Sequence, residues 1–428
     1  MFYSQLKKII FIVGFFIITS LHFSCQNLME KDRFAGFEKI IDTNKIRPVA
    51  GKPHCKVIDV NIPPLDSGFF DYNKYLDSIH FIPLQTTTAS LIGKISKVFF
   101  SKNRIIVVDS RITESVFIFD AKGRFINKIG VAKKQMNGTS VNDLTHFFCT
   151  AYFDTEKKII LYDDQKSKLY YFDDNGNFIK SERTYVAFSD FMNIKGSSSF
   201  AYLSLYAGNK HIPFLQKSDL YLGDKDTRIT QIAPQAVQKL TIKGNYYYDD
   251  NLISSGDAFF YTPVFSDLVY QVEGGSQLDV YPKLHLHFPG PNINDKVKES
   301  PHIDVSQLNQ LLNSHQYYSF HGKVLKTNDS IYYVECTKND QLGYFYSTQT
   351  KHIIGGHISS TQNAGDSTKV DFYAYPMASN GHEFISLLEP DFWAYNKNSL
   401  YTARFSKAIQ GFNKNSNPIL IFYTLRKF

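Results

Sequence analysis

The sequence predicts an all-β protein built from repeated antiparallel units, the arrangement of a β-propeller or a similar array. Two segments, residues 105–126 and residues 159–179, are near copies of each other. Each holds an apolar run ending in Asp, a second strand-like run, and a turn containing Gly. The copies are offset by 54 residues in their first halves and 53 in their second, a typical length for a propeller blade. The chain is also rich in aromatic residues, at 15%, as strand-forming proteins are.

The first strand of each copy, Ile105–Val108 and Ile159–Tyr162, is apolar at consecutive positions, which favours burial of both faces between stacked sheets. Asp109 and Asp163 follow these strands at equivalent positions. A catalytic site breaks the symmetry of a repeat, whereas a structural residue recurs with it. We therefore interpret both carboxylates as structural groups that end a strand.

The turns Asp120–Gly123 and Asp173–Gly176 predict tight hairpins, because Gly supplies a positive φ and Asp can bond the turn backbone. Each unit is a small meander that cannot bury its faces alone, so several units must pack side by side. Further strand-like segments follow at intervals of about 50 to 70 residues, which gives six units in all. One helix is expected, with Asp304 as its cap and apolar residues from Val305 to Leu312 at helical spacing.

The N-terminus predicts export. Lys7 and Lys8 precede the apolar run Ile9–Ile18, and Cys25 follows at the expected cleavage point. The pattern resembles a bacterial lipoprotein signal, in which that Cys carries lipid, although His22 departs from the usual aliphatic residue. An uncleaved membrane anchor is the alternative, but the apolar run is short for a span. The expected organisation is a signal peptide at 1–24, a tether at 25–54 and a propeller at 55–428.

The net charge bears on the possible partners, and the cysteines bear on possible zinc sites and disulfides. The formal net charge is +7 over 428 residues, with no basic stripe, so nucleic acid is not expected as a partner. Cys55, Cys149 and Cys336 lack the spacing of a zinc site and are expected to be ordinary buried or half-buried residues, with one disulfide as the alternative.

The motif His285-Leu286-His287 places two imidazoles on one face of a strand, because side chains two residues apart point the same way. A metal site would need a third or fourth ligand from another blade, which the spacing does not supply. A pair that faces solvent is the favoured interpretation, with His285 and His287 kept as metal candidates. The sequence carries no nucleophile elbow, phosphate loop or zinc-protease motif, so neither a catalytic residue nor a cofactor is predicted.

The chain resembles the six-bladed β-propeller lipoproteins of Bacteroidota, a group mostly of unknown function. The resemblance extends from Lys56 to Phe428 and rests on the two clear repeats and on four further segments: residues 77–87 with 91–95, 266–270, 281–283 and 417–423. It implies six blades of four antiparallel strands. It also implies that the ring closes when an early strand near Val57–Val60 pairs with the C-terminal strand Ile419–Thr424.

Two functions remain open. The first is a noncatalytic binding or assembly module, held by its lipid to the outer membrane on the periplasmic or the outer side, with a polysaccharide, peptide or envelope protein as ligand. Exposed aromatic residues at Tyr246–Tyr248, Tyr317–Tyr318 or Phe392–Trp393 could stack on such a ligand. The alternative is a propeller hydrolase or lyase with a metal or an acid/base group in the central channel. The first is favoured because no motif requires the second, although fold alone cannot decide between them.

Overall fold

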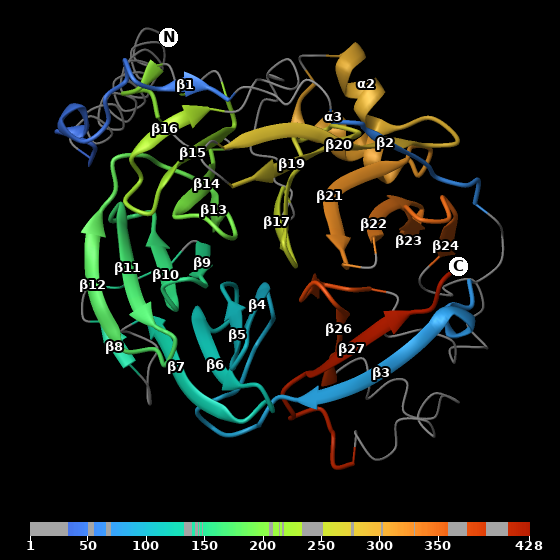
Figure 1. Cartoon of the computed structure of the whole chain (residues 1–428), viewed down its shortest axis with the longest axis horizontal. Helices are drawn as coiled ribbons and strands as arrows, with labels where there is room; N and C mark the ends of the chain where they lie inside the picture. Colours follow the sequence, from blue (N-terminus) through green and yellow to red (C-terminus); the bar gives the residue numbers. More distant parts are fainter. Residues whose placement is uncertain are drawn as a thin grey trace, which may run out of the picture.

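Six antiparallel sheets form a closed ring in the computed structural model (Figure 1). This confirms the predicted all-β, six-bladed propeller. The structure describes residues 33–49, 55–65, 70–131, 139–141, 144, 146–147, 149–204, 209–213, 215, 218–232, 251–274, 278–300, 303–328, 330–357, 375–390 and 410–428.

Each blade is a four-stranded meander, and the first strand named in each blade lies nearest the centre of the ring (Figure 1). From the innermost strand outward, the strands are: blade 1, β4 (Lys97–Ser101), β5 (Arg104–Asp109), β6 (Ser115–Asp120), β7 (Phe125–Val131); blade 2, β9 (Cys149–Phe153), β10 (Lys158–Asp163), β11 (Lys168–Asp173), β12 (Phe178–Arg183); blade 3, β13 (Asp190–Asn193), β14 (Ser199–Leu203), β15 (Leu220–Asp224), β16 (Ile229–Ile232); blade 4, β17 (Leu252–Ser255), β18 (Ala258–Tyr261), β19 (Leu268–Glu273), β20 (Asp279–His287); blade 5, β21 (Ser319–Lys326), β22 (Ile331–Lys338), β23 (Asp340–Ser347), β24 (Ile353–His357); blade 6, β25 (Ala378–Ser379), β26 (Phe384–Leu388), β27 (Ile419–Leu425), β3 (Leu76–Pro83).

The two sequence repeats are blades 1 and 2. Their second strands, β5 and β10, are buried along almost their whole length, as the continuous apolar pattern predicted. The hairpins that follow also agree with the prediction: Gly123 has φ 78° and Gly176 has φ 85°. Asp120 and Asp173 each accept two backbone hydrogen bonds inside their own turn, at 2.8 and 2.9 Å. The repeat therefore encodes both the buried strand and its turn.

Gly123 is expected to be among the least replaceable turn residues. A Cβ there would overlap the carbonyl oxygen of Pro83 in the neighbouring blade, in addition to the strain of a positive φ. Gly196 is a matched control, because it has φ 76° but open space around it. Gly196→Ala should destabilise the protein by about 1 to 2 kcal/mol and Gly123→Ala by about 3 kcal/mol or more, as urea unfolding can measure. Equal losses would contradict the close contact between blades 1 and 6.

Ring closure occurs in blade 6, where β27 pairs with β3 in antiparallel register from Ile419↔Pro83 to Leu425↔Leu76. Figure 1 shows β3, in blue, beside β27, in red. Pairing of an early strand with the last strand is thus confirmed. The prediction that Val57–Val60 is that early strand was wrong. The eight residues of β3 offer a longer ladder than the segment at Val57–Val60, which lies in another blade.

That segment forms β2 (Ile58–Asn61) and adds in parallel to the outer edge of blade 4, with Ile58 opposite Leu284. Two other short strands extend outer edges in the same way: β1 (Arg47–Pro48) beside β16, and β8 (Thr139–Val141) beside β7. These additions cover strand edges that would otherwise be free to pair with other chains.

The segment predicted as a tether differs from that expectation in its described part. Phe34, Ile41, Ile46 and Val49 are each no more than 5% exposed. Val49 donates its backbone N–H to Ile232 at 2.8 Å, and Phe34 stacks on His211 with ring centroids 4.3 Å apart. A 3₁₀ turn, η1 (Phe37–Lys39), lies between these contacts. Residues 33–49 thus pack on the propeller, because their spaced apolar side chains find a hydrophobic surface.

Two helices lie between β20 and β21: α2 (Ile293–Glu299) and α3 (Val305–Asn313). Helix α3 confirms the prediction, with Asp304 and Gln307 forming a reciprocal capping box. Helix α2 was missed. A second 3₁₀ turn, η2 (Tyr72–Tyr75), precedes β3. Among the residues that the structure describes, no helix is long and apolar enough to cross a membrane.

Candidate functional site

A pocket of about 120 Å³ lies at one end of the channel, where the innermost strands finish. Five of the six blades contribute to it. Its walls hold aromatic rings, amides and hydroxyls, together with one acid and one lysine: Val98, Phe99, Phe100, Tyr152, Asp154, Met192, Asn193, Lys195, Ser254, Gly256, Ala378, Ser379 and Asn380.

The polar groups of this pocket are held in place by their neighbours. The amide nitrogen of Asn193 donates to two backbone carbonyls of the adjacent turn, at 3.1 and 3.0 Å. Lys195 pairs with Asp257 at 2.7 Å, and Asp154 pairs with Lys157 at 2.9 Å. Both charged lining residues are thus already engaged in ion pairs. The pocket is a preorganised polar surface with aromatic walls.

The opposite ends of the inner strands carry an ion pair. Lys97 at the start of β4 contacts both carboxylate oxygens of Asp190 at the start of β13, each at 2.6 Å. This ion pair joins blades 1 and 3. Cys149, the first residue of β9 in blade 2, lies near both of its charges. Burial raises the pKa of the Cys149 thiol well above its ordinary value, so the thiol stays protonated and unreactive.

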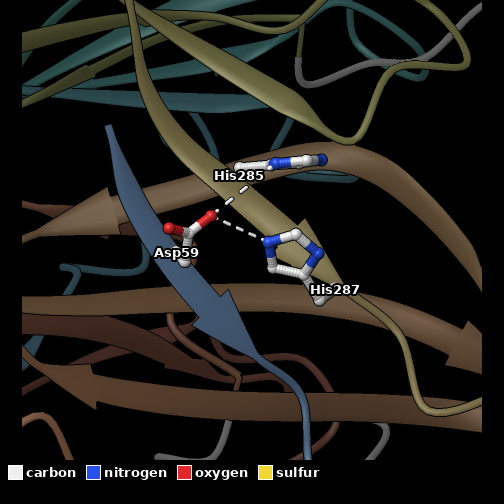
Figure 2. A group of neighbouring side chains, drawn as sticks. All are labelled: Asp59, His285 and His287. Carbon is white, nitrogen blue, oxygen red and sulfur yellow. Dashed lines mark hydrogen bonds and ion pairs between the residues drawn. The ribbon is translucent and has the colours of Figure 1, made fainter. Parts of the chain in front are cut away.

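A second group of side chains lies on the outer edge of blade 4. The parallel register of β2 and β20 sets Asp59 beside His285, with His287 two residues further along the same face. Figure 2 shows the three side chains pointing toward one another, with Asp59 from β2 and both histidines from β20. The Nε2 atom of His287 lies 2.8 Å from Asp59 Oδ1, and the Nδ1 atom of His285 lies 3.7 Å from it. The hydrogen bond from His287 lowers the pKa of Asp59, so this carboxylate is ionised at neutral pH.

The expectation drawn from the sequence of β20 alone therefore changes, because β2 lies beside it. His285 and His287 do share a face and are each 41% exposed in their side chains, which fits the predicted solvent-facing pair. Asp59 supplies the additional ligand that the spacing of the histidines could not reveal. Two imidazoles and a carboxylate, with donor atoms within 4.8 Å of one another, form a set that can hold a metal ion.

A family model described as a domain of unknown function, DUF4934, matches residues 56–424. The chain belongs to the DUF4934 family. No match was found among curated proteins. The match begins just before β2 and ends within β27, so the family domain includes the strands that close the ring.

Two of the solved structures similar to this DUF4934 protein come from the genus Bacteroides. A protein from Bacteroides fragilis described as exported shares 18% identity, with a TM-score of 0.67 over 87% of this chain and 100% of its own. A member of the DUF4221 family from Bacteroides vulgatus shares 12% identity, with a TM-score of 0.43 over 82% of this chain and 97% of its own. At such identities the first likeness supports the propeller fold and nothing beyond it.

The two repeated carboxylates have structural surroundings in this DUF4934 protein. Both side chains are fully buried at the end of their strands. Asp109 accepts hydrogen bonds from the backbone of Gly93, Lys94 and Ile112 and from Thr113, so it ties two loops to β5. Asp163 accepts a hydrogen bond from the backbone N–H of Lys166 at 3.0 Å. Neither lines the channel-end pocket.

The remaining candidates are dispersed. Cys55 is half-buried, Cys149 and Cys336 are buried, and all three are free in the described part of the chain, as expected of ordinary thiols. Tyr318 is buried against Phe288 rather than exposed for stacking. The lipidation candidate Cys25, the signal segment, Tyr246–Tyr248 and Phe392–Trp393 lie outside the described residues.

Sequence reasoning missed Asp59 and the pocket. Asp59 stood in a segment that was recognised as a strand but assigned to the wrong blade, so its distance from the histidines was misjudged. The lining of the pocket comes from single residues of five blades, and no linear pattern joins them. The only sequence signal that could have indicated the pocket was the position at which each innermost strand ends.

Proposed function

We propose that this DUF4934 protein is an exported, lipid-anchored module of the bacterial cell envelope that binds a partner without catalysis through its channel-end pocket. The observation that carries the proposal is the lining of that pocket: amides, hydroxyls and aromatic rings, with both charged side chains already paired. Such a lining suits hydrogen bonding and stacking. Acid/base or metal chemistry would call for several titratable groups that converge on one point.

The size of the pocket indicates what kind of ligand it suits. A volume of about 120 Å³ is well below the roughly 300 to 1,000 Å³ of sites that enclose a small molecule. It matches one sugar ring or one amino-acid side chain. The partner in this proposal is therefore a polysaccharide, peptide or envelope protein that inserts a single unit, with the rest of it lying outside.

The location in this proposal rests on the N-terminal sequence. The basic and apolar leader and Cys25 resemble those of an exported lipoprotein, and a fold relative from Bacteroides fragilis is described as exported. A lipid on Cys25 would hold the propeller at the outer membrane. The partner would then be a component of the same envelope or a molecule that reaches its surface.

The pocket can be tested by filling it. Ser254 is an exposed residue of its wall, so Ser254→Phe adds a ring to the cavity without disturbing the core. The protein, extracted in detergent from cells that make the full chain, is added to envelopes from cells that lack it, and the bound fraction is measured. The variant should lose affinity by tenfold or more, which corresponds to about 1.4 kcal/mol.

A matched control is Ser78→Phe, which places the same ring on an exposed position of the outer strand β3. Binding by this variant should equal that of the wild type. Prior digestion of the envelopes with protease distinguishes a protein or peptide partner from a polysaccharide. Wild-type binding by Ser254→Phe would contradict the proposed site, and release of cleaved envelope fragments by the wild type would favour a hydrolase or lyase.

A further inference from the structure

The group on the outer edge of blade 4 has the geometry of a cation site. Strand alternation sends Val60, Leu284 and Leu286 into the core and leaves Asp59, His285 and His287 together on the other face. The two imidazole rings lie 4.1 Å apart between centroids, and both face the same carboxylate. The register of β2 and β20 already brings the three donor side chains together.

The spacing of the donor atoms suits tetrahedral coordination. Bonds of 2.0 to 2.1 Å to nitrogen and oxygen place the ligand atoms of a tetrahedral zinc ion about 3.3 Å from one another. The separations from Asp59 Oδ1, 2.8 Å to His287 and 3.7 Å to His285, lie on either side of that value. Small side-chain rotations would equalise them. The side chains are 41% and 64% exposed, so the fourth position is open to water.

We propose that Asp59, His285 and His287 bind a divalent transition-metal ion of the zinc type, which fastens β2 to blade 4. Imidazole nitrogen selects such ions over calcium and magnesium, which prefer oxygen donors. The ion would link two strands whose ligands lie 228 residues apart in sequence and which share only four pairs of residues. A metal clip between distant segments adds most where few other contacts hold them together.

One neighbour opposes the cation. Lys56 lies close enough to Asp59 to interact with its charge. Its ammonium group should weaken binding of a divalent ion by repulsion. Lys56→Gln is therefore expected to bind the metal more tightly than the wild type, whereas loss of any of the three ligands should weaken it. Opposite effects of two nearby substitutions are not produced by general damage to the fold.

The test uses Zn²⁺ alone and the detergent-extracted protein made from the full chain. Equilibrium dialysis followed by elemental analysis should give one tightly held Zn²⁺ per chain in excess of the double variant His285→Ala/His287→Ala. That variant should bind at least about 100-fold more weakly, and Asp59→Asn at least about tenfold. Since all three side chains are partly exposed, each variant should unfold at the wild-type temperature when a chelator is present.

The matched control is His80→Gln. His80 is an exposed histidine that faces Glu383 at 3.2 Å in blade 6, so it tests whether any surface histidine beside a carboxylate retains zinc. Zinc should also slow amide hydrogen exchange in residues 58–62 of the wild type and leave that of the double variant unchanged. Equal zinc content in wild type and double variant, or an equal loss in His80→Gln, would overturn the proposal.

Discussion

Deletion of residues 417–428 is expected to abolish the cooperative unfolding transition of this protein. The deleted segment contains β27, which lies between β26 and β3 and bonds both. Six of its apolar side chains are buried: Ile419, Leu420, Ile421, Phe422, Tyr423 and Leu425. At about 1.5 to 3 kcal/mol for each buried side chain, their loss amounts to about 9 to 18 kcal/mol, which is as large as the roughly 5 to 15 kcal/mol of a typical net stability.

Circular dichroism during urea unfolding measures this effect. The matched control is Val60→Ala in β2, which is buried but lies in an added edge strand outside the ring closure. It should lower the free energy of unfolding by roughly 2 kcal/mol and keep a single sharp transition. A truncated protein that unfolds with the midpoint of the full chain would show that β27 does not close the ring.

The repeated carboxylates Asp109 and Asp163 are expected to respond in opposite ways to the same substitution. Asp109→Asn should cost about 3 to 4 kcal/mol at pH 7, because Oδ2 accepts bonds from Gly93, Lys94 and Thr113, and an amide NH₂ would point a donor at those donors. Asp163→Asn keeps an oxygen for the backbone N–H of Lys166. It should leave stability within about 0.5 kcal/mol of the wild type, or raise it.

The pH dependence of unfolding distinguishes the two sites. Burial acts to raise the pKa of Asp109, but the hydrogen bonds it accepts outweigh burial and lower the pKa. Its contribution is therefore fully present above the pKa of the unfolded chain, near 4, and is lost as pH falls through the lower folded value. Burial raises the pKa of Asp163, helped by Asp164 and opposed by Lys166 and His146. Ionisation of Asp163 thus weakens the fold, and the penalty disappears as pH falls through the raised pKa.

Denaturant titrations from pH 3 to pH 7 on both variants give the comparison. The stability difference between wild type and Asp109→Asn should shrink toward the acid end. The difference for Asp163→Asn should be most favourable to the variant at pH 7 and should decline as Asp163 of the wild type becomes protonated. Parallel curves for the two variants would contradict the assignment of opposite pKa shifts to equivalent positions of the repeat.

The parts of the fold that could be predicted are those that leave a local pattern. Two buried strands with Gly turns recur in near copies, and Asp304 begins a helix with leucines at helical spacing. Helix α2 was missed because only Ile293 and Val297 in its seven residues are apolar and buried. The number of blades could be predicted because strand spacing repeats even where the sequence of the repeat fades.

The pairing partner of a short strand could not be predicted. Alternation along β2 fixes which of its side chains share a face, but any exposed sheet edge can accept four residues. The error in placing β2 also concealed Asp59, because the histidines gain their third neighbour only in the correct register. The pocket was hidden for a similar reason, since its residues meet only once the ring has closed.

The central claim is that the channel-end pocket receives a partner in the envelope. Its most direct test is photo-cross-linking in living cells, with a benzophenone amino acid placed at Ser254 in the pocket wall and, as control, at Ser78 on the outer strand of blade 6. We expect irradiation to attach a discrete envelope component at position 254 and not at position 78. Equal labelling at both positions, or labelling at position 78 alone, would contradict the account.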